Sequence, residues 1–486
     1  DDPTVQSRVR NMVEKESLPL SERRQFLAAL LNSRDAELPP ILFRLLKSDL
    51  RSEALRGLSA YDDPSTAVMI LKHYSDFKSG EKRDALSTLV SRKAYAHVLL
   101  KAIEAKQVSR KDLTADLISQ LRNLRDPKLD ARLKSVWGTV RKSTAEKQKL
   151  IAHYRRIIGR QRQTELRSLG RAVFAKTCQQ CHTLFGVGGK VGPDLTGSNR
   201  ADVNYLLSNI LDPSAVLGKD YVSSIIETSK GRLITGLIRE QSKDAITVVT
   251  QNETIIIPRS EIDSVRSSGQ SMMPENLLAQ LSNDEVRGLV SYLASPRQVR
   301  MEATQENAAS LFNGKDLTGW RGDTRYWKVD NGEIIGTRPK ANPNRNEFLI
   351  SDLIVSDFRL SFEVKLSPNS GNSGVQFRSE ALKNGDVSGY QADIGQGWWG
   401  KLYEEHGRAL LWKKAGDQHV KVGSWNSYVI EAKGDRLRTW INGKLCVDLT
   451  DKAGRKKGVL ALQVHSGPPF EVRFRKLKLE VMKDTP

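Results

Sequence analysis

Apolar residues in the first third of the chain recur at helical spacing, and glycine is rare there. Segments of helix length follow polar or proline-containing breaks, which predicts a series of short amphipathic helices. The predicted helices span residues 22–31, 38–47, 50–58, 65–74, 81–92, 94–105, 110–121 and 130–136. Short amphipathic helices in series bury their apolar faces on their neighbours, so the pattern favours an α-solenoid. An irregular helical domain is the alternative.

The middle of the chain combines helical and strand patterns. One amphipathic helix is predicted at 166–174, and a second begins at a capping box at 282–285. Between them, residues 219–268 form short β-branched runs separated by polar turns, which predicts a small inserted sheet or barrel. Gly170 weakens the first helix by about 1 kcal/mol. We therefore expect the second helix to cross it closely, with Tyr292 packed over the glycine.

The last third of the chain has strand periodicity. Alternating apolar and polar residues predict strands at 327–329, 333–336, 348–351, 357–366, 374–379, 389–394, 425–433, 436–441, 458–465 and 472–479. Asn442-Gly443 predicts a tight hairpin, and many antiparallel strands together predict a β-sandwich. The expected domains are a helical one at 1–164, a second helical one with the β insertion at 165–298, and the sandwich at 306–486.

The amino-acid composition excludes fewer functions than the pattern of apolar and polar residues does. The chain has 486 residues and a net charge of +20, from 77 basic and 57 acidic side chains. The charge is spread along the chain without a nucleic-acid-binding motif, so we interpret it as solvated surface and expect no nucleic-acid partner. No apolar run is long enough for a transmembrane segment. The basic, polar stretch at 138–165 is typical of a long linking helix.

The run Cys178-Gln179-Gln180-Cys181-His182 has the spacing that attaches c-type haem. Each thiol adds to one haem vinyl group, and the adjacent histidine is held where it can ligate the iron. A redox disulfide is the alternative, but that use of CxxC belongs beside a strand–helix pattern of thioredoxin type. A structural zinc site would need a second pair of ligands. The third cysteine, Cys446, lies far away in a strand pattern, where we expect a buried, inert thiol.

The loop at 192–197 reads GPDLTG, and it resembles the corresponding loop of class I cytochromes c. We expect the carbonyl of Pro193 to accept the second ring N–H of His182. The resemblance also implies a methionine as the sixth iron ligand. Met273 fits the family's Met-Pro motif better than Met272 does, and two methionines that merely fill a core are the alternative.

A sheet inserted between the histidine and the methionine resembles the haem-binding domain family of large multidomain bacterial proteins, over residues 165–298. The resemblance implies one covalent haem c, electron transfer, and a periplasmic or other extracytoplasmic location. From the joining of this domain to the C-terminal strand-rich domain we expect a redox partner protein, either a sugar dehydrogenase or an electron acceptor. We expect the chain to be a mature form or a fragment of a longer exported protein. A haem sensor with an open sixth position is a further alternative.

The helices of the first third resemble HEAT repeats in pattern only, which suggests a scaffold or docking surface. The last third carries LFNGKDLTGW at 311–320, GNSGVQFRS at 371–379, GYQADI at 389–394, WNSYVIEAKGDRLRTWINGK at 425–444 and GVLALQVHSG at 458–467. Together these motifs resemble the 3-keto-disaccharide hydrolase family, a concanavalin-like sandwich. The resemblance implies a carbohydrate ligand oxidised at C3. A base removes the acidified C2 proton, the C1 aglycone leaves with acid assistance, and a cation or a metal stabilises the enolate.

Strand alternation sorts the candidate residues of the sandwich. Polar side chains alternate with apolar ones on several strands, and we expect them to share one sheet face that forms a groove for sugar. The candidate cation, base and acid are Arg378, Asp393, Glu404, Glu405 and His465. The candidate substrate-binding residues are Glu363, Gln376, Gln391, Trp398, Trp399 and Gln463. The loop at 396–408 fits the family loosely, so sugar binding without cleavage is the alternative.

These patterns together predict an exported c-type haem protein that transfers electrons, joined to a sandwich that binds carbohydrate or cleaves 3-keto-glycosides. The alternative is a non-catalytic module that transfers electrons and docks on glycans or proteins.

Overall fold

The computed structural model describes residues 3–141, 143–160, 163–250, 253–339 and 345–482. The chain divides into two compact units. Unit 1 comprises residues 1–162, 176–286 and 293–296, and unit 2 comprises residues 163–175, 287–292 and 297–486. The three domains predicted from the sequence have other limits, and those limits stay predictions.

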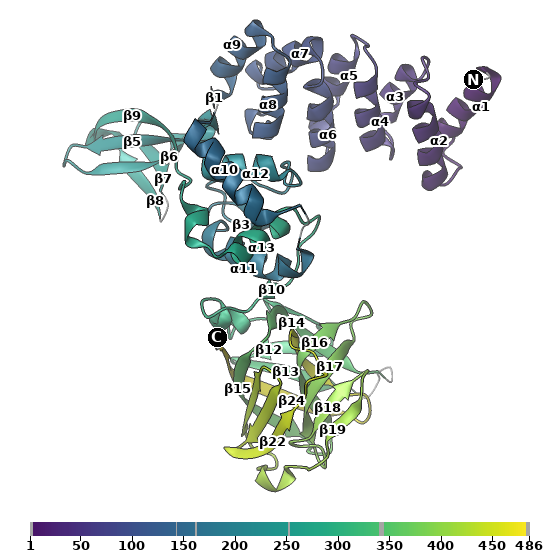
Figure 1. Ribbon diagram of the computed structural model, residues 1–486, viewed down its shortest axis with the longest axis vertical. Helices are drawn as coiled ribbons and strands as arrows, with labels where there is room; N and C mark the ends of the chain where they lie inside the picture. Colours follow the sequence, from purple (N-terminus) through teal and green to yellow (C-terminus); the bar gives the residue numbers. More distant parts are fainter. Residues whose placement is uncertain (1–2, 142, 161–162, 251–252, 340–344, 483–486) are drawn as a thin grey trace. The chain divides into compact units, whose positions relative to one another are not determined.

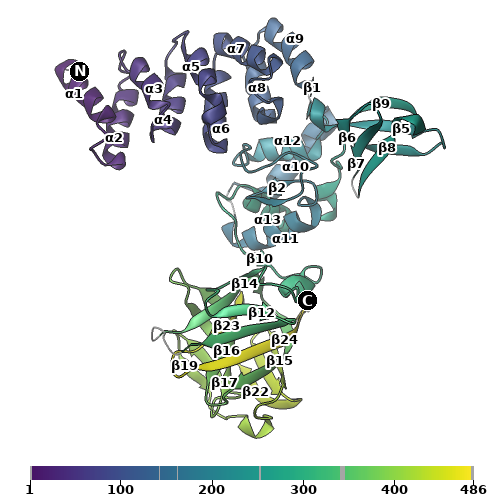
Figure 2. The same ribbon diagram turned by 180° about the vertical axis from the view of Figure 1, so that it is seen from behind.

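In the N-terminal region of unit 1, helices follow one another in a row (Figures 1 and 2). They are α1 Pro3–Glu14, α2 Leu20–Asn32, α3 Pro39–Leu45, α4 Arg51–Gly57, α5 Thr66–Lys72, α6 Ser79–Leu89, α7 Lys93–Glu104, α8 Ala115–Asn123 and α9 Pro127–Val136. Alternate helices pack on each other, as α4 does on α6, α5 on α7 and α7 on α9. The predicted helical character is confirmed, and a HEAT-like solenoid stays a prediction.

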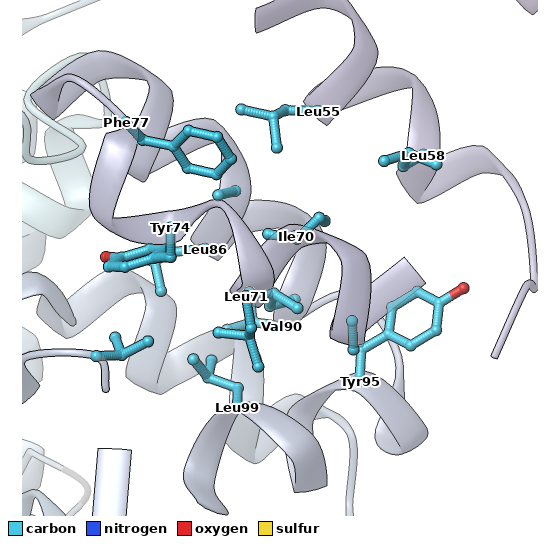
Figure 3. Packing of buried hydrophobic residues seen from close by; sticks show 14 of the residues in the cluster. Leu55, Leu58, Ile70, Leu71, Tyr74, Phe77, Leu86, Val90, Tyr95 and Leu99 are labelled. Carbon is cyan, nitrogen blue, oxygen red and sulfur yellow. The ribbon is translucent and has the colours of Figure 1, made fainter. Parts of the chain in front are cut away.

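The apolar positions of these helices form one continuous core. Leu55 of α4, Ile70 of α5, Leu86 of α6 and Leu99 of α7 are all buried in it (Figure 3). Burying a side chain of this size stabilises the fold by about 1.5–3 kcal/mol relative to exposure. The periodicity that predicts the helices is therefore the one that holds them together.

The helix predicted at 138–165 is present only in part, and its predicted limits are wrong. Its first residues form strand β1 (Gly138–Val140), which pairs antiparallel with β4 (Val216–Gly218). Helix α10 (Ala145–Ile158) begins only after its N-cap, Thr144, and it ends at Gly159, which has a φ of 73°. Strand pairing, a cap and a left-handed glycine thus confine the helix to the middle of the stretch.

Two helices cross at a pair of glycines. They are α11 (Arg167–Thr177) and α13 (Asn283–Leu293). A methyl group built at Gly170 would lie 1.9 Å from the carbonyl oxygen of Gly288, so the two backbones touch. Tyr292 packs edge-on against Phe174, with ring centroids 5.6 Å apart. The predicted close crossing is confirmed, although Gly288 rather than Tyr292 lies over Gly170.

The predicted β insertion is present in unit 1. The segment before it contains β2 (Thr183–Leu184), β3 (Val187–Gly188) and α12 (Val203–Leu211). The insertion itself consists of β5 Val222–Thr228, β6 Leu233–Gln241, β7 Ala245–Val249, β8 Thr254–Pro258 and β9 Ile262–Ser271. Its strands pair antiparallel in the order β8-β7-β6-β5-β9. The β-branched residues Ile226, Ile234, Ile246, Val248 and Ile257 form its core.

Unit 2 contains a sandwich of two sheets (Figure 1). The eight-stranded sheet consists of β10 Met301–Glu302, β11 Trp320–Arg321, β14 Glu347–Val355, β16 Asn372–Ala381, β17 Val387–Gly395, β18 Leu402–Glu405, β19 Ala409–Trp412 and β23 Gly458–Val464. The seven-stranded sheet consists of β12 Trp327–Asp330, β13 Glu333–Arg338, β15 Phe358–Ser367, β20 Asn426–Lys433, β21 Arg436–Ile441, β22 Lys444–Thr450 and β24 Phe470–Val481.

The strand order explains which predicted residues can meet. In the first sheet β14, β23, β16, β17 and β18 are successive neighbours, whereas β15 lies between β24 and β20 in the other sheet. Aromatic and aliphatic side chains fill the space between the sheets. The predicted hairpin is confirmed, because Ile441 pairs with Lys444 around Asn442-Gly443, whose φ angles of 48° and 77° suit a two-residue turn. Cys446 on β22 is half-buried.

Candidate functional site

Four buried polar residues share the outer face of the eight-stranded sheet. Gln376 lies on β16, Gln391 and Asp393 on β17, and Gln463 on β23. Their neighbours along each strand, such as Val375, Ala392 and Leu462, belong to the core between the sheets. Alternation therefore directs the polar side chains away from that core, as the sequence predicts.

A glycine opens the centre of this face. Gly374 pairs with Gln463 on one side and with Asp393 on the other, so the two polar residues flank a position that has no side chain. The side chain of Gln391 lies over the glycine, and a methyl group there would come within 2.6 Å of its Cγ and Cδ. Any larger residue at position 374 would displace Gln391.

Hydrogen bonds run across the face in one direction. Ser379 Oγ donates to Gln376 Oε1 (3.1 Å), and Gln376 Nε2 donates to Gln391 Oε1 (2.8 Å). Gln391 Nε2 then donates to Asp393 Oδ1 (2.7 Å). Each hydrogen bond fixes the orientation of the next amide, so this series of hydrogen bonds holds one carboxylate oxygen of Asp393 in place.

The other polar atoms at the centre have no hydrogen-bond partner among the residues that the structure describes. Asp393 is 2% exposed and its Oδ2 makes no hydrogen bond, while Gln463 is fully buried and neither Oε1 nor Nε2 is bonded. An unsatisfied buried polar group costs about 1–3 kcal/mol. Groups of this kind are rare in folded proteins and require an explanation, such as a catalytic or binding role.

The electrostatics of the face single out Asp393. Burial raises the pKa of its carboxyl to about 7, and the nearby charge of Glu405 adds to the rise, while the hydrogen bond from Gln391 and the charge of Lys401 oppose it. Burial also raises the pKa of Glu405, against the charges of His406 and His465. His465 Nδ1 lies 2.6 Å from the Ser466 carbonyl oxygen, which can only accept, so Nδ1 carries a proton in this contact.

Arg378 lies elsewhere. The pairing of β16 shifts register between Gln376 and Ser379, and Arg378 in this bulge has a φ of 48°. The extra residue reverses the alternation, so Ser379 takes the place beside Gln376. Arg378 is fully buried and donates to the carbonyls of Ser356 (2.6 Å) and Gly434 (2.8 Å) and to Asp357 Oδ1 (2.6 Å). The prediction that Arg378 shares the polar face is wrong, and its contacts are structural.

Two other predicted carboxylates are also separated from the face. Glu363 lies on β15, in the seven-stranded sheet, where Arg475 (2.6 Å) and Lys476 (2.8 Å) donate to it and lower its pKa. Glu404 pairs across the strands with Tyr390, a core residue, and Arg408 lowers the pKa of Glu404 by hydrogen bonding. Neither residue has the environment of a general acid.

The two tryptophans behave differently. Trp399 is buried in the core and its Nε1 donates to Asn369 Oδ1 (3.0 Å), so it is not available to stack on a ligand. Trp398 is 37% exposed, with the Lys401 ammonium 4.8 Å from its ring centre. A cavity of about 350 Å³ lies on the other sheet and is lined by Glu333, Lys365, Ser367, Trp425, Glu471 and Arg473, none of which is a predicted site residue.

Sequence reasoning misses Ser379 and Gly374. Both belong to the GNSGVQFRS motif, but the bulge that places Ser379 on the polar face depends on pairing with two neighbouring strands. The space over Gly374 matters because the side chain of Gln391, from the neighbouring strand β17, fills it. A glycine inside a strand pattern is the one signal that points to it.

The Cys178–His182 run lies in unit 1, immediately after α11 ends at Thr177. The amides of Cys181 (3.1 Å) and His182 (2.9 Å) both donate to the Cys178 carbonyl, which folds the run into a turn. His182 Nδ1 lies 2.9 Å from the Pro193 carbonyl oxygen, the contact that the sequence predicts. With Nδ1 engaged, Nε2 is the ring nitrogen that would ligate the iron in the predicted haem site.

The surroundings of the run fit a covalent haem. A methyl group at Gly192 would lie 2.6–3.0 Å from ring atoms of His182, and one at Gly189 would lie 1.9 Å from the Gln180 carbonyl oxygen. The loop therefore closes on the histidine only with glycines. Burial raises the pKa of the Cys178 thiol to about 11 and raises the pKa of Cys181 as well, the opposite of what a redox-active CxxC needs.

Met272 and Met273 follow strand β9 directly, and both are half-buried. The amide N–H of Met273 donates to Ser271 Oγ (3.1 Å). The roles of Cys178, Cys181, His182 and Met273 toward haem stay predictions. Among the described helices, none has the length and apolar character that a membrane span requires.

Residues 307–480 match the family model of the 3-keto-alpha-glucoside-1,2-lyase-like domain. Among solved structures, a candidate glycosyl hydrolase from Parabacteroides distasonis is 21% identical, covers 37% of this chain and 98% of its own, and has a TM-score of 0.29. A carbohydrate-binding module from Bacillus subtilis is 19% identical, with 33% and 95% coverage and a TM-score of 0.26. A β-glucanase from Bacillus licheniformis is 11% identical, with 34% and 94% coverage and a TM-score of 0.26.

No curated protein matches the sequence. The family match and the two-sheet architecture agree over the same residues. The C-terminal part of the chain is therefore a β-sandwich domain of the carbohydrate-active kind.

Proposed function

We propose that the sandwich cleaves 3-keto-glycosides by elimination on the outer face of its eight-stranded sheet. The observation that carries the proposal is the buried Oδ2 of Asp393 and, across Gly374 from it, the buried amide of Gln463, neither of which has a hydrogen-bond partner among the described residues. The matched family supports it, because its description names a 1,2-lyase acting on 3-keto-glucosides. Half-buried Tyr403 and Glu405 from β18 lie on the same face as Gln391, so substrate approaches over them.

Asp393 is the general base in this reaction. A carboxyl with a pKa of about 7 is half ionised at neutral pH and is more basic than an ordinary carboxylate. Its Oδ2 removes the proton from C2, which the C3 ketone acidifies. The electron pair moves into the C2–C3 bond as an enolate, returns to form the C1–C2 double bond, and the C1–oxygen bond breaks. The leaving oxygen takes its proton from Glu405, whose pKa burial raises.

Gln463 replaces Arg378 as the group that stabilises the enolate. Its Nε2 has no partner and can donate to the oxygen on C3, while its Oε1 accepts from a neighbouring hydroxyl. Gln376 and Gln391 act through Asp393 by holding its Oδ1.

Aglycone release from a nitrophenyl 3-keto-glucoside by the whole chain tests the proposal. Asp393→Asn removes the base and leaves the hydrogen bond from Gln391 a partner, so we expect release to fall about 10²–10⁴-fold. Glu363→Gln is the matched control, because it removes a carboxylate on the other sheet and leaves release unchanged. Turnover that survives Asp393→Asn contradicts the proposal. Calorimetric binding of the sugar without turnover by the unaltered chain favours the alternative, a non-catalytic docking module.

We also propose that the Cys178–His182 run carries one haem c, with Cys178 and Cys181 as thioether attachments and His182 and Met273 as iron ligands. The tight glycine loop and the His182–Pro193 hydrogen bond support this assignment. The group supplies one-electron transfer when bound. The chain holds the imidazole by its Nδ1–H, and the Met-Pro turn after β9 supplies the thioether. Such a protein works outside the cytoplasm, with a sugar dehydrogenase or an electron acceptor as its redox partner.

The absorption spectrum of the protein, produced with a cytochrome c maturation system, tests the haem assignment. We expect a pyridine haemochrome spectrum typical of two thioether links, and its loss in Cys178→Ala/Cys181→Ala. Met273→Ala removes the methionine-to-iron band and lets carbon monoxide bind, whereas Met272→Ala keeps the band. A reduced protein that already binds carbon monoxide points to the sensor alternative.

A further inference from the structure

One arginine of the inserted sheet reaches the loop that contains Pro193. Arg239 lies on β6, and its Nη2 donates to the carbonyl oxygens of Val191 and Lys190, the latter at 3.3 Å. Its Nη1 donates to the carbonyl of Asp220 (3.4 Å), and the guanidinium lies 5.7 Å from the centre of the Tyr221 ring. The side chain thus connects Asp220 and Tyr221, which immediately precede β5, to residues 190–191.

These two carbonyls immediately precede the residues that orient His182. The Gly192 amide donates to the Cys181 carbonyl (2.8 Å), and the Pro193 carbonyl lies 2.9 Å from His182 Nδ1. Residues 189–199 contain no helix or strand, so a few hydrogen bonds fix the loop. A displacement at Val191 passes along the backbone to Gly192 and Pro193 within two residues.

The sheet is itself anchored at the point where Arg239 binds. Asp220 accepts a bidentate ion pair from Arg110, with Nε to Oδ2 at 2.7 Å. Arg110 belongs to the N-terminal helical region of unit 1, between α7 and α8. Arg239 therefore links the loop of residues 189–199 (the histidine loop) to Asp220, and Asp220 is itself bound by Arg110.

We propose that the inserted sheet acts as a clamp on the histidine loop and that Arg239 is a positioning residue for His182. The proposal rests on the proposed haem function for its consequence, but the clamp itself concerns only residues of this chain. Arginine suits the role because its planar fork donates in two directions while it lies on an aromatic ring. Lysine has one compact charge, and it reaches either the loop carbonyls or the Asp220 carbonyl.

The consequence is a control of the iron's ligand field. The hydrogen bond from a ligating histidine to a carbonyl raises the basicity of the imidazole, and ligand basicity is one of the means by which a protein sets a haem potential. Weakening the His182–Pro193 hydrogen bond makes the imidazole a poorer donor and favours the ferrous state. Loss of Arg239 therefore raises the reduction potential.

Three variants of the full chain test the clamp. Arg239→Gln removes it, Arg239→Lys retains the charge, and Arg259→Gln is the matched control. Arg259 lies between β8 and β9 of the same sheet but donates to the Ser242 carbonyl (3.2 Å) and to Gln241 Oε1 (3.1 Å), away from the histidine loop. The measurements are amide hydrogen exchange at 186–197 and the midpoint potential of the haem-loaded protein.

For Arg239→Gln we expect exchange of the Gly192 amide to quicken on the order of tenfold, because its hydrogen bond opens more often, and the potential to rise. Arg239→Lys gives an intermediate result and Arg259→Gln matches the unaltered chain. Unchanged exchange in Arg239→Gln overturns the clamp, and quicker exchange with an unchanged potential overturns the positioning role. If the chain takes up no haem, the missing haemochrome spectrum refutes the haem proposal, and the exchange rates alone decide whether Arg239 holds the loop.

Discussion

At the scale of single residues, alternation predicts which side chains face away from the core, and one bulge sets the limit of that prediction. Gln376, Gln391, Asp393 and Gln463 lie on the face that the two-residue period gives them. Arg378 does not, because the extra residue in β16 reverses the period after Phe377. A bulge is fixed by pairing with neighbouring strands, and the sequence of one strand does not contain it.

The pKa of Asp393 gives a stability prediction with a definite sign. Its folded pKa of about 7 is above the ordinary value, so the folded state binds a proton that the unfolded state releases. The stabilisation is fully present below the unfolded pKa, near about 4, and is lost as pH rises to about 7. Its size is on the order of 4 kcal/mol. Asp393→Asn has no carboxyl to ionise, so its free energy of unfolding does not fall in this way. Relative to the unaltered chain, its stability therefore increases as pH rises from about 4 to about 7.

Urea unfolding at several pH values, followed through the tryptophan fluorescence of the sandwich, measures this difference. The comparison cancels other titrating groups, because they are present in both proteins. A constant difference between the two proteins from acid to neutral pH would show that Asp393 is not buried as an acid. In the same window, the aglycone release assigned to Asp393 rises with pH, since the base must be ionised.

At the scale of elements, helix and strand periodicity predicts most of the fold. The helices α2 to α7, the inserted strands β5 to β8 and the main strands of the sandwich lie where their patterns indicate, whereas β9 is not predicted as a strand. The helix predicted at 138–165 is longer than the observed helix α10. Its polar composition suits a helix, but contacts with other segments decide where the helix begins and ends. Gly138 sits where a methyl group would come within 2.3 Å of the Leu217 carbonyl oxygen, a strand contact made with a segment far along the chain.

The crossing of α11 and α13 predicts an unusual response to alanine. Alanine normally stabilises a helix relative to glycine by about 1 kcal/mol. At Gly170 the added methyl group meets the Gly288 backbone at 1.9 Å, and backbone cannot rotate away. We expect Gly170→Ala to destabilise the fold by about 1–3 kcal/mol.

Thermal unfolding with Gly80→Ala as the matched control checks this. Gly80 lies in the first turn of α6, and a methyl group there meets nothing within 4 Å. That variant keeps or slightly raises the melting temperature. Equal behaviour of the two variants would mean that the α11–α13 contact is looser than the structure has it.

At the scale of the whole molecule, separate cores imply separate folding. The core of the N-terminal helices runs from Val13 to Trp137, and the core of the sandwich runs from Ala303 to Leu479. Domains with their own cores unfold as separate cooperative units unless a large apolar interface joins them. We expect two heat-absorption peaks in calorimetry, with Asp393→Asn shifting only one of them. A single peak that shifts as a whole would contradict this independence.

The sequence by itself determined the periodicities, the Asn442-Gly443 hairpin, the insertion before Met273, and the close approach at Gly170, because each depends on residues near in the chain or on one residue's shape. The tertiary structure decided which strands share a sheet, which separates Glu363 from Asp393. It also decided where Arg378 lies, that Gln391 packs over Gly374, and that Arg239 contacts the histidine loop. These features depend on contacts between distant segments, and no local pattern of apolar and polar residues records them.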